Sequence, residues 1–395
     1  MKKYDSNTVN FFFRLLRAGL WGSVEEIDWT GTDAGGNRPD AGNIDWRCLY
    51  RLAMEQTVAG YTAVGLERFA SAKGATAGET AAITAVPEKV MQAFNKVKIS
   101  TGLRNFRMND FIVKLFHMLN DAGIEPLLLK GQGVARNYLY PELRQPGDID
   151  LLLHGEDYEK AKMLLVPKAD KLEEEGQENL HLGIHFGDIE VELHGTINAG
   201  FGKKNNVFLS GMQSEMFGQK DFSSWVYEGT DIKLPSANFD AVFIFTHFLH
   251  HFYYGGLGLR QICDWTMHLH KNSRLIDVER LEPDIKALGL LREWQTFGCF
   301  AVKYLGLTAS DMPMYSGRYY ESCDKIMDFL FAAGNFGHHR GRADYSNKPY
   351  LVRKAKSLFL KGGDMLELFS LFPGNTIKFF FVFLGTGFST VAKGK

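Results

Sequence analysis

Two aspartates with a single residue between them, Asp148 and Asp150, precede an apolar run at positions 151–153. If these residues form a strand, both carboxylates point to the same face, because side chains alternate along a strand with a period of two. Two carboxylates this close repel each other unless a cation or a proton lies between them. Hard oxygen ligands of this kind suit Mg²⁺ or Mn²⁺ rather than a soft metal. The pair therefore predicts a divalent-cation site and indicates phosphoryl transfer on a nucleotide.

Basic residues lie upstream of this acidic pair. A Lys130-Gly131 step follows the apolar run 127–129 and opens a short helical segment, and Arg144 lies between this step and the aspartates. Two interpretations are open for each cation. Lys130 is either a phosphate contact or a surface lysine at the end of a strand. Arg144 either contacts a nucleotide phosphate or only neutralises the acidic pair and fixes its loop.

The periodicity of apolar residues divides the chain into three parts, which we place at 1–122, 123–235 and 236–395. The first part and the last part show helical periodicity. In the first part the expected helical segments are 6–22, 46–64 and 87–122, the last as one or two long helices. A loop rich in Gly, Asn, Asp and Pro is expected over 30–43.

The middle part alternates between short apolar runs and helical patterns. The expected strands are 126–130, 147–154, 181–186 and 188–195, and the expected helices are 131–139 and 156–165. A tight turn at positions 187–188 joins the last two strands. The sequence therefore predicts an α+β protein, in which helical regions flank a small mixed sheet.

Several motifs of this middle part occur in a fixed order: Leu-Leu-Leu-Lys-Gly at 127–131, then Arg144, Asp-Ile-Asp at 148–150, and Glu-Val-Glu-Leu-His at 190–194. In this order they resemble the nucleotidyltransferase superfamily with the polymerase-beta-like fold. More narrowly, the chain resembles a bacterial family of nucleotidyltransferases whose substrates are largely unknown. Weaker similarity extends over most of the chain.

The resemblance implies a three-carboxylate metal site, in which Glu192 on a neighbouring strand joins Asp148 and Asp150. Glu190 shares a strand face with Glu192, so either is a candidate for the third carboxylate, and we favour Glu192. His194 follows on the same face, as a structural hydrogen-bonding residue or as part of the site.

The resemblance also implies that the helix beginning at Gly131 presents its N-terminus to the triphosphate of an NTP, with Lys130 and Arg144 neutralising its phosphates. Unpaired N–H groups and the helix dipole favour anions there, and glycine allows a close approach. The chain departs from the usual Gly-Ser pair of the superfamily, because Lys130-Gly131 is followed by Gln132, where a hydroxyl is common.

A group of histidines offers a different chemistry. His247 and His251 are four residues apart, a spacing that can bind a metal from one helix face, and Asp264 and His268 repeat it downstream. A metal-dependent phosphohydrolase would use such residues. His250 lies in the same stretch, which is rich in Phe and Tyr. Such surroundings instead favour histidines that form hydrogen bonds within a helical core.

Two further sets of polar residues have plain interpretations. Arg260 and Asp264, also four apart, are expected to form an intrahelical ion pair. The stretch 338–340, His-His-Arg, follows a glycine in an expected loop, where a phosphate contact is the alternative to a solvated surface.

Composition limits the partners. A net charge of −1 creates no general field that would attract nucleic acid or an anionic membrane. The four cysteines are far apart and form no zinc motif, which fits a reducing compartment. No leader is apparent, and the most apolar stretch, 379–384, is shorter than the roughly 20 residues of a membrane-spanning helix. We therefore expect a cytoplasmic protein without a membrane span.

The resulting hypothesis is a Mg²⁺- or Mn²⁺-dependent nucleotidyltransferase that uses an NTP such as ATP and releases pyrophosphate. The acceptor, a hydroxyl or a phosphate, stays open, as do the preferred base and the oligomeric state. The first alternative is a non-catalytic nucleotide- or partner-binding protein on the same fold. The second is the phosphohydrolase centred on His247, His251 and Asp264.

Overall fold

The computed structural model describes residues 4–23, 44–71, 85–176, 180–197, 200–254, 256–333, 363, 365–366 and 368–392. The stretch 338–340, for which a phosphate contact was considered, lies outside the described residues. So does the whole loop expected over 30–43.

A five-stranded mixed sheet forms the centre of the fold, in the order β1-β2-β5-β4-β3. The strands are β1 (Leu127–Leu129), β2 (Ile149–Leu152), β3 (Lys171–Leu172), β4 (His181–Phe186) and β5 (Ile189–His194). Strands β2 and β5 run parallel, and the other neighbours run antiparallel. With helices on both sides, this is the α+β fold that the sequence predicts.

Strands β1 and β2 are buried on both faces, which explains why their sequences are almost continuously apolar. On one face, Leu128 and Leu151 share a core with Ile112 and Phe116 of a long helix. On the other face, β1 and β2 pack in a second core that includes Phe243.

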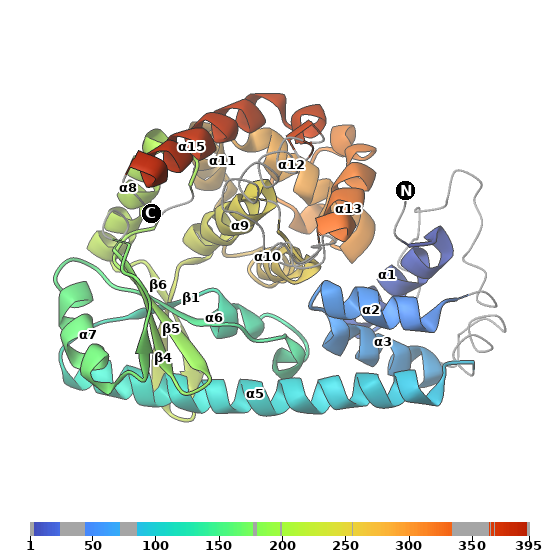
Figure 1. Cartoon of the computed structure of the whole chain (residues 1–395), viewed down its shortest axis with the longest axis horizontal. Helices are drawn as coiled ribbons and strands as arrows, with labels where there is room; N and C mark the ends of the chain where they lie inside the picture. The colour runs from blue at the N-terminus through green and yellow to red at the C-terminus, as the bar shows by residue number, and fades with distance from the viewer. Residues whose placement is uncertain are drawn as a thin grey trace.

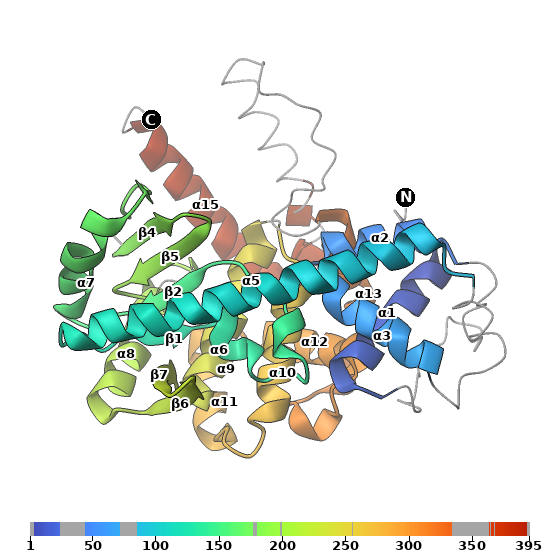
Figure 2. The same cartoon turned by 90° about the horizontal axis from the view of Figure 1, so that it is seen from below.

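The long helix, α5 (Glu88–Asp121), connects the parts of the molecule, as Figures 1 and 2 show. One end lies against the sheet, and the other end lies against the N-terminal helices α1 (Ser6–Trp21), α2 (Trp46–Glu55) and α3 (Ala59–Ser71). The prediction for 87–122 is confirmed as one helix. The segment 46–64 is divided instead into α2 and α3, and Thr57 between them has a positive φ of 56°.

Residues 196–235 contain elements that the sequence pattern did not indicate. They are helix α8 (Lys203–Gln219) and a hairpin of β6 (Phe222–Tyr227) and β7 (Thr230–Pro235). Ile232 and Leu234 of β7 are buried in the core beneath the sheet. The helix expected over 131–139 is shorter: α6 covers Gly131–Ala135, and a 3₁₀ turn, η2, follows at Pro141–Leu143.

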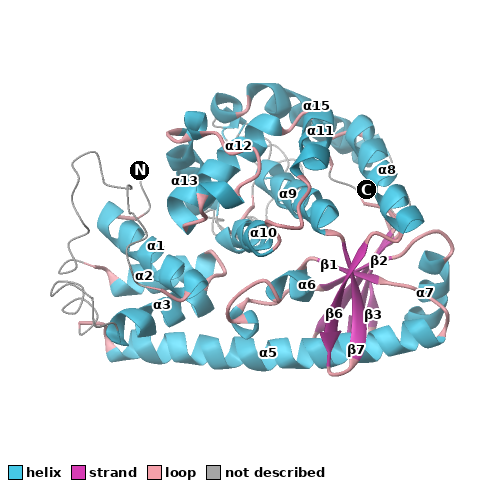
Figure 3. Cartoon of the chain, turned by 180° about the vertical axis from the view of Figure 1, so that it is seen from behind, coloured by secondary structure: helices cyan, strands magenta, loops and turns pink. Residues whose placement is uncertain are grey.

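The C-terminal part is helical, as expected, and covers one side of the sheet (Figures 1 and 3). Its helices are α9 (Ala237–Tyr254), α10 (Leu259–Lys271), α11 (Val278–Leu288), α12 (Leu291–Phe300), α13 (Ser322–Ala333) and α15 (Pro373–Ala392). These helices share one hydrophobic core with the N-terminal helices; Phe13 and Phe331, for example, stack at 6.0 Å. No helix in the described part of the chain has the length and apolar content needed to span a membrane.

Candidate functional site

The register of the sheet brings three carboxylates together. In the parallel pair of β2 and β5, Asp150 lies opposite Glu192, and Asp148 immediately precedes β2. One oxygen from each carboxylate lies within 4.8 Å of the other two. Glu190, one step along the face, instead groups with Glu173 and His185. Of the two candidates for the third carboxylate, Glu192 is therefore the one beside the aspartates.

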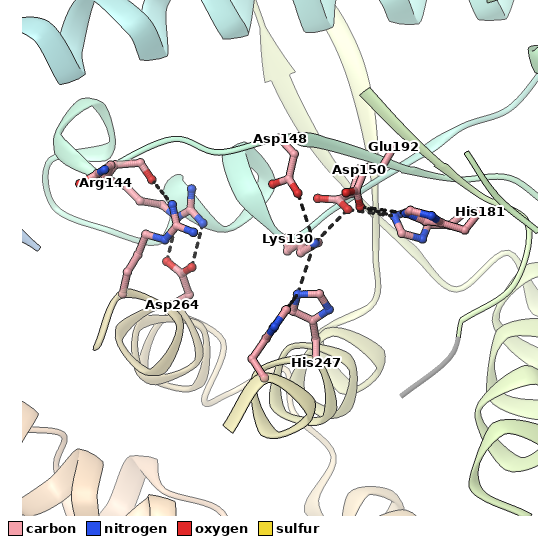
Figure 4. A network of polar contacts seen from close by, with 12 residues as sticks. Lys130, Arg144, Asp148, Asp150, His181, Glu192, His247 and Asp264 are labelled. Carbon is pink, nitrogen blue, oxygen red and sulfur yellow. Dashed lines mark hydrogen bonds and ion pairs between the residues drawn. The ribbon is translucent and has the colours of Figure 1, made fainter. Parts of the chain in front are cut away.

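Lys130 places its ammonium group between the two aspartates (Figure 4). Its Nζ lies 2.9 Å from Oδ1 of Asp150, 3.8 Å from Oδ2 of Asp148 and 3.3 Å from Nε2 of His247. The Lys130 backbone, at the junction of β1 and α6, has a φ of 37°. A non-glycine residue at such a φ carries roughly 1–3 kcal/mol of strain, which the surrounding structure must offset.

The carboxylates have very different acidities. Burial and the charge of Asp148 raise the pKa of Asp150 to about 6. The Lys130 ammonium lowers the pKa of Asp148. For Lys130 itself, burial opposes the charged form, but Asp148 and Asp150 more than compensate and raise its pKa. The site therefore holds a buried cation against two carboxylates of unequal basicity.

Two histidines complete the hydrogen bonding of the carboxylates. His194 Nε2 lies 2.9 Å from Asp150 Oδ1 and 3.3 Å from Glu192 Oε2, and His181 Nε2 lies 3.2 Å from the same Glu192 oxygen. Burial alone would raise the pKa of Glu192, but hydrogen bonds from the two histidines hold it far below its usual value. Burial likewise opposes the charged form of His194, but its bonds to Asp150 and Glu192 raise its pKa to about 9.

His181 was not identified from the sequence as a site residue, although the expected hairpin of 181–186 and 188–195 places it beside His194. A two-residue turn after 181–186 pairs His181 with His194, the register that the structure has. Directly paired residues lie on the same face of a sheet, so His181 had to lie beside His194.

The donor set fits a divalent cation. Oδ2 of Asp150 is fully buried and has no hydrogen-bond partner among the described residues. A buried carboxylate oxygen without a partner is unfavourable, and a cation would satisfy it. The three oxygens come from carboxylates, the ligands that Mg²⁺ and Mn²⁺ favour.

Asp148 and Glu192 line a cleft of about 470 Å³ between the sheet and helices α9 and α10, and Asp150 is buried beside them. Gly131 lies at its edge with a φ of 45°, and a Cβ there would lie 3.4 Å from the carbonyl oxygen of Asp148. The lining residues are Lys130, Gly131, Arg144, Asp148, His181, Glu192, His194, Thr196, Ile244, His247, Phe248, His250, His251, Arg260, Gln261 and Asp264.

Arg144 is held in the wall of this cleft by Asp264. Its Nε and Nη2 donate to the two carboxylate oxygens of Asp264 at 2.8 Å each, and the Tyr138 hydroxyl donates to the same carboxylate at 2.7 Å. The expectation of an intrahelical pair between Arg260 and Asp264 is wrong, because Arg260 Nη1 instead donates to the carbonyl oxygen of Gln145. Nη1 of Arg144 is buried without a hydrogen-bond partner among the described residues.

The histidines of α9 reach the site, but not as a separate metal centre. His247 Nε2 lies 3.2 Å from His251 Nε2 and also faces Lys130. Asp264 forms an ion pair with Arg144, and Nε2 of His268 lies 2.9 Å from the carbonyl oxygen of Ala237. In the part of the chain that is described, the groups able to hold an ion include none of His247, His251, Asp264 and His268.

A small mixed sheet with three clustered carboxylates, enclosed by helices, is the arrangement expected of a nucleotidyltransferase. A family model described as "uncharacterised nucleotidyltransferase" matches residues 42–306, about two thirds of the chain. The chain belongs to this family. No curated protein matches it. The bacterial origin and the place in the polymerase-beta-like superfamily stay predictions.

The pair of Arg144 and Asp264 predicts a large effect on stability. Asp264→Ala leaves a buried guanidinium without its partner, so we expect the free energy of unfolding to fall by about 3–5 kcal/mol. Denaturant titration measures this loss. Glu282→Ala removes the partner of Lys286 in an exposed pair and should cost less than about 1 kcal/mol. A loss for Asp264→Ala as small as that of the control would contradict the structural role.

The raised pKa of His194 predicts a pH-dependent stability in protein stripped of metal ions. Between pH 6.5 and about 9 the folded state holds a proton on His194 that the unfolded state has lost. The stabilisation is therefore complete below pH 6.5 and disappears as the pH rises through 9. The stability advantage of wild type over His194→Gln, measured by denaturant titration, should shrink over this range. An advantage that stays constant from pH 6 to 9.5 would contradict the charged His194.

Proposed function

We propose that the protein transfers a nucleoside monophosphate from an NTP to a hydroxyl or phosphate acceptor and releases pyrophosphate. One observation carries this proposal: Asp148, Asp150 and Glu192 converge on one point at the edge of a cleft, in a chain of a nucleotidyltransferase family. The buried, unpartnered Oδ2 of Asp150 supports a cation as part of the site.

The three carboxylates would hold Mg²⁺ or Mn²⁺. When bound, such ions neutralise phosphate charge and stabilise both oxygens of an in-line displacement. The chain itself positions the carboxylates on neighbouring strands rather than on loops, so their spacing depends on the register of β2 and β5. Rigid placement of this kind favours a defined geometry of the reacting groups.

Lys130, Arg144 and Gly131 would bind the triphosphate. Lys130 lines the cleft, and its ammonium can exchange a carboxylate partner for a phosphate oxygen. Asp264 orients Arg144, whose buried Nη1 is available to a further acceptor. The backbone of Gly131 allows a close approach. Helix α6 has only five residues, so it contributes a smaller dipole than the expected longer helix.

A non-catalytic binding protein on the same fold is the second candidate, and one observation favours it. Gln132 stands where a hydroxyl is common in the superfamily, but it is buried and donates a hydrogen bond to Asn109 at 2.7 Å. Gln132 is also not among the residues that line the cleft. This binding protein would bind an NTP with Mg²⁺ but release no pyrophosphate.

The net charge of −1 disfavours nucleic acid, and a cytoplasmic location is part of the proposal. The phosphohydrolase alternative lacks a geometric basis, because Asp264 is paired with Arg144 rather than placed beside His247 and His251.

Nucleotide binding tests the proposal. Calorimetric titration with ATP, GTP, CTP and UTP, each with Mg²⁺, should detect one preferred nucleotide for wild type. Asp150→Asn, measured under conditions in which circular dichroism verifies that it is folded, should weaken this binding at least about a hundredfold, because it removes a central ligand. Pyrophosphate release with candidate acceptors separates the enzyme from the binding protein.

Asp188→Asn is the matched control, because Asp188 lies at the hairpin turn and pairs with Arg107 on the surface. It should bind the nucleotide as wild type does. Equal binding by wild type and Asp150→Asn, or no binding of any nucleotide by wild type, would contradict the proposal.

A further inference from the structure

The face that carries the carboxylates also carries two imidazoles, whose positions follow from strand pairing. His181 on β4 lies directly opposite His194 on β5, and Glu192 precedes His194 by two residues. All three side chains therefore project from the same face of the sheet. Figure 4 shows His181 on the side of Glu192 that faces away from Lys130.

The spacing of the donor atoms fits a single metal ion. Nε2 of His181 and Nε2 of His194 lie 3.2 Å and 3.3 Å from the same oxygen of Glu192. One donor atom from each of the three residues lies within 4.8 Å of the others. Metal–ligand bonds of about 2.0–2.2 Å place neighbouring ligands about 3–3.5 Å apart, so little movement is needed.

The chemistry of these donors differs from that of the three carboxylates. Imidazole nitrogen suits zinc and similar transition metals, whereas Mg²⁺ prefers carboxylate and water oxygens. Two histidines and one carboxylate also leave open coordination positions for another ligand. A Mg²⁺ ion would therefore select the aspartate side of Glu192, and a transition metal would select the histidine side.

The position of these three residues allows an ion to reach them. His181, Glu192 and His194 all line the cleft, so the donors are accessible to an ion. Asp150 lies outside the group but borders it, because its Oδ1 lies 2.9 Å from Nε2 of His194.

We propose that His181, Glu192 and His194 form a binding position for a transition-metal ion of the Zn²⁺ type, separate from the Mg²⁺ position at Asp148 and Asp150. Glu192 lies between the two positions and contributes to both. This metal position stands on the strand geometry alone and does not require that the protein transfers nucleotides.

Cobalt substitution tests this position, because Co²⁺ resembles Zn²⁺ in its ligands and its visible absorption reports the ligand field. The full-length protein, treated with a chelator and then freed of it, is titrated with Co²⁺ in the presence of excess Mg²⁺. Wild type should bind Co²⁺ at this position with a visible d–d band, and Zn²⁺ should displace it.

The decisive variant is His181→Gln, which keeps a hydrogen-bond donor for Glu192 but removes the imidazole ligand. It should weaken Co²⁺ binding at least about a hundredfold. His185→Gln is the strand-matched control: His185 lies on the same face of β4, four residues further, and pairs with Glu173. It should bind Co²⁺ as wild type does. Circular dichroism verifies that both variants fold.

Three results would overturn the proposal: no Co²⁺ band in wild type, an unchanged band in His181→Gln, or an equal loss in His185→Gln. Its failure is distinguishable from failure of nucleotidyl transfer, because binding of an NTP with Mg²⁺ to wild type is measured without Co²⁺. A Co²⁺ band without nucleotide binding would leave the metal position standing and refute the transferase. Nucleotide binding without a Co²⁺ band would refute the transition-metal position and leave the proposed nucleotidyl transfer standing.

Discussion

The ion pair between the Lys130 ammonium and the Asp150 carboxylate is the interaction on which this site depends. The Asp150 side chain is completely buried, and a buried carboxylate is costly unless a cation or hydrogen bonds compensate it. Lys130 and His194 supply this compensation from two different elements. The left-handed backbone of Lys130, between β1 and α6, directs its side chain to this point.

The rest of the fold keeps these charges in register. The parallel pairing of β2 and β5 sets Asp150 beside Glu192, and the bidentate pair of Arg144 and Asp264 ties the loop before β2 to helix α10. Helices α9 and α10 and the N-terminal helices share one hydrophobic core. Helix α5 packs against this core at one end and against the sheet at the other. The two walls of the cleft are therefore joined through packed helices rather than through a flexible linker.

The parts of the site that follow from local periodicity could be predicted from the sequence. Period-two alternation placed Asp148 and Asp150 on one face, and the expected strands 181–186 and 188–195 agree closely with β4 and β5. The Arg144 and Asp264 pair could not be predicted, because 120 residues separate its partners and only tertiary packing joins them. For the same reason the expected pair of Arg260 and Asp264 was wrong. An ion pair between residues four apart on a helix is weak compared with the buried bidentate pair that Asp264 forms with Arg144. The hairpin of β6 and β7 was missed because its strands are only partly apolar.

The most direct test of the central claim is the stability of Lys130→Met with and without Mg²⁺. The substitution keeps much of the side-chain volume and removes the charge that compensates Asp150. We expect the metal-free variant to lose about 3–5 kcal/mol of unfolding free energy, and Mg²⁺ to restore most of it by replacing the ammonium group. Stability that falls but does not respond to Mg²⁺ or Mn²⁺, or that does not fall at all, would contradict the account of this group as a cation site.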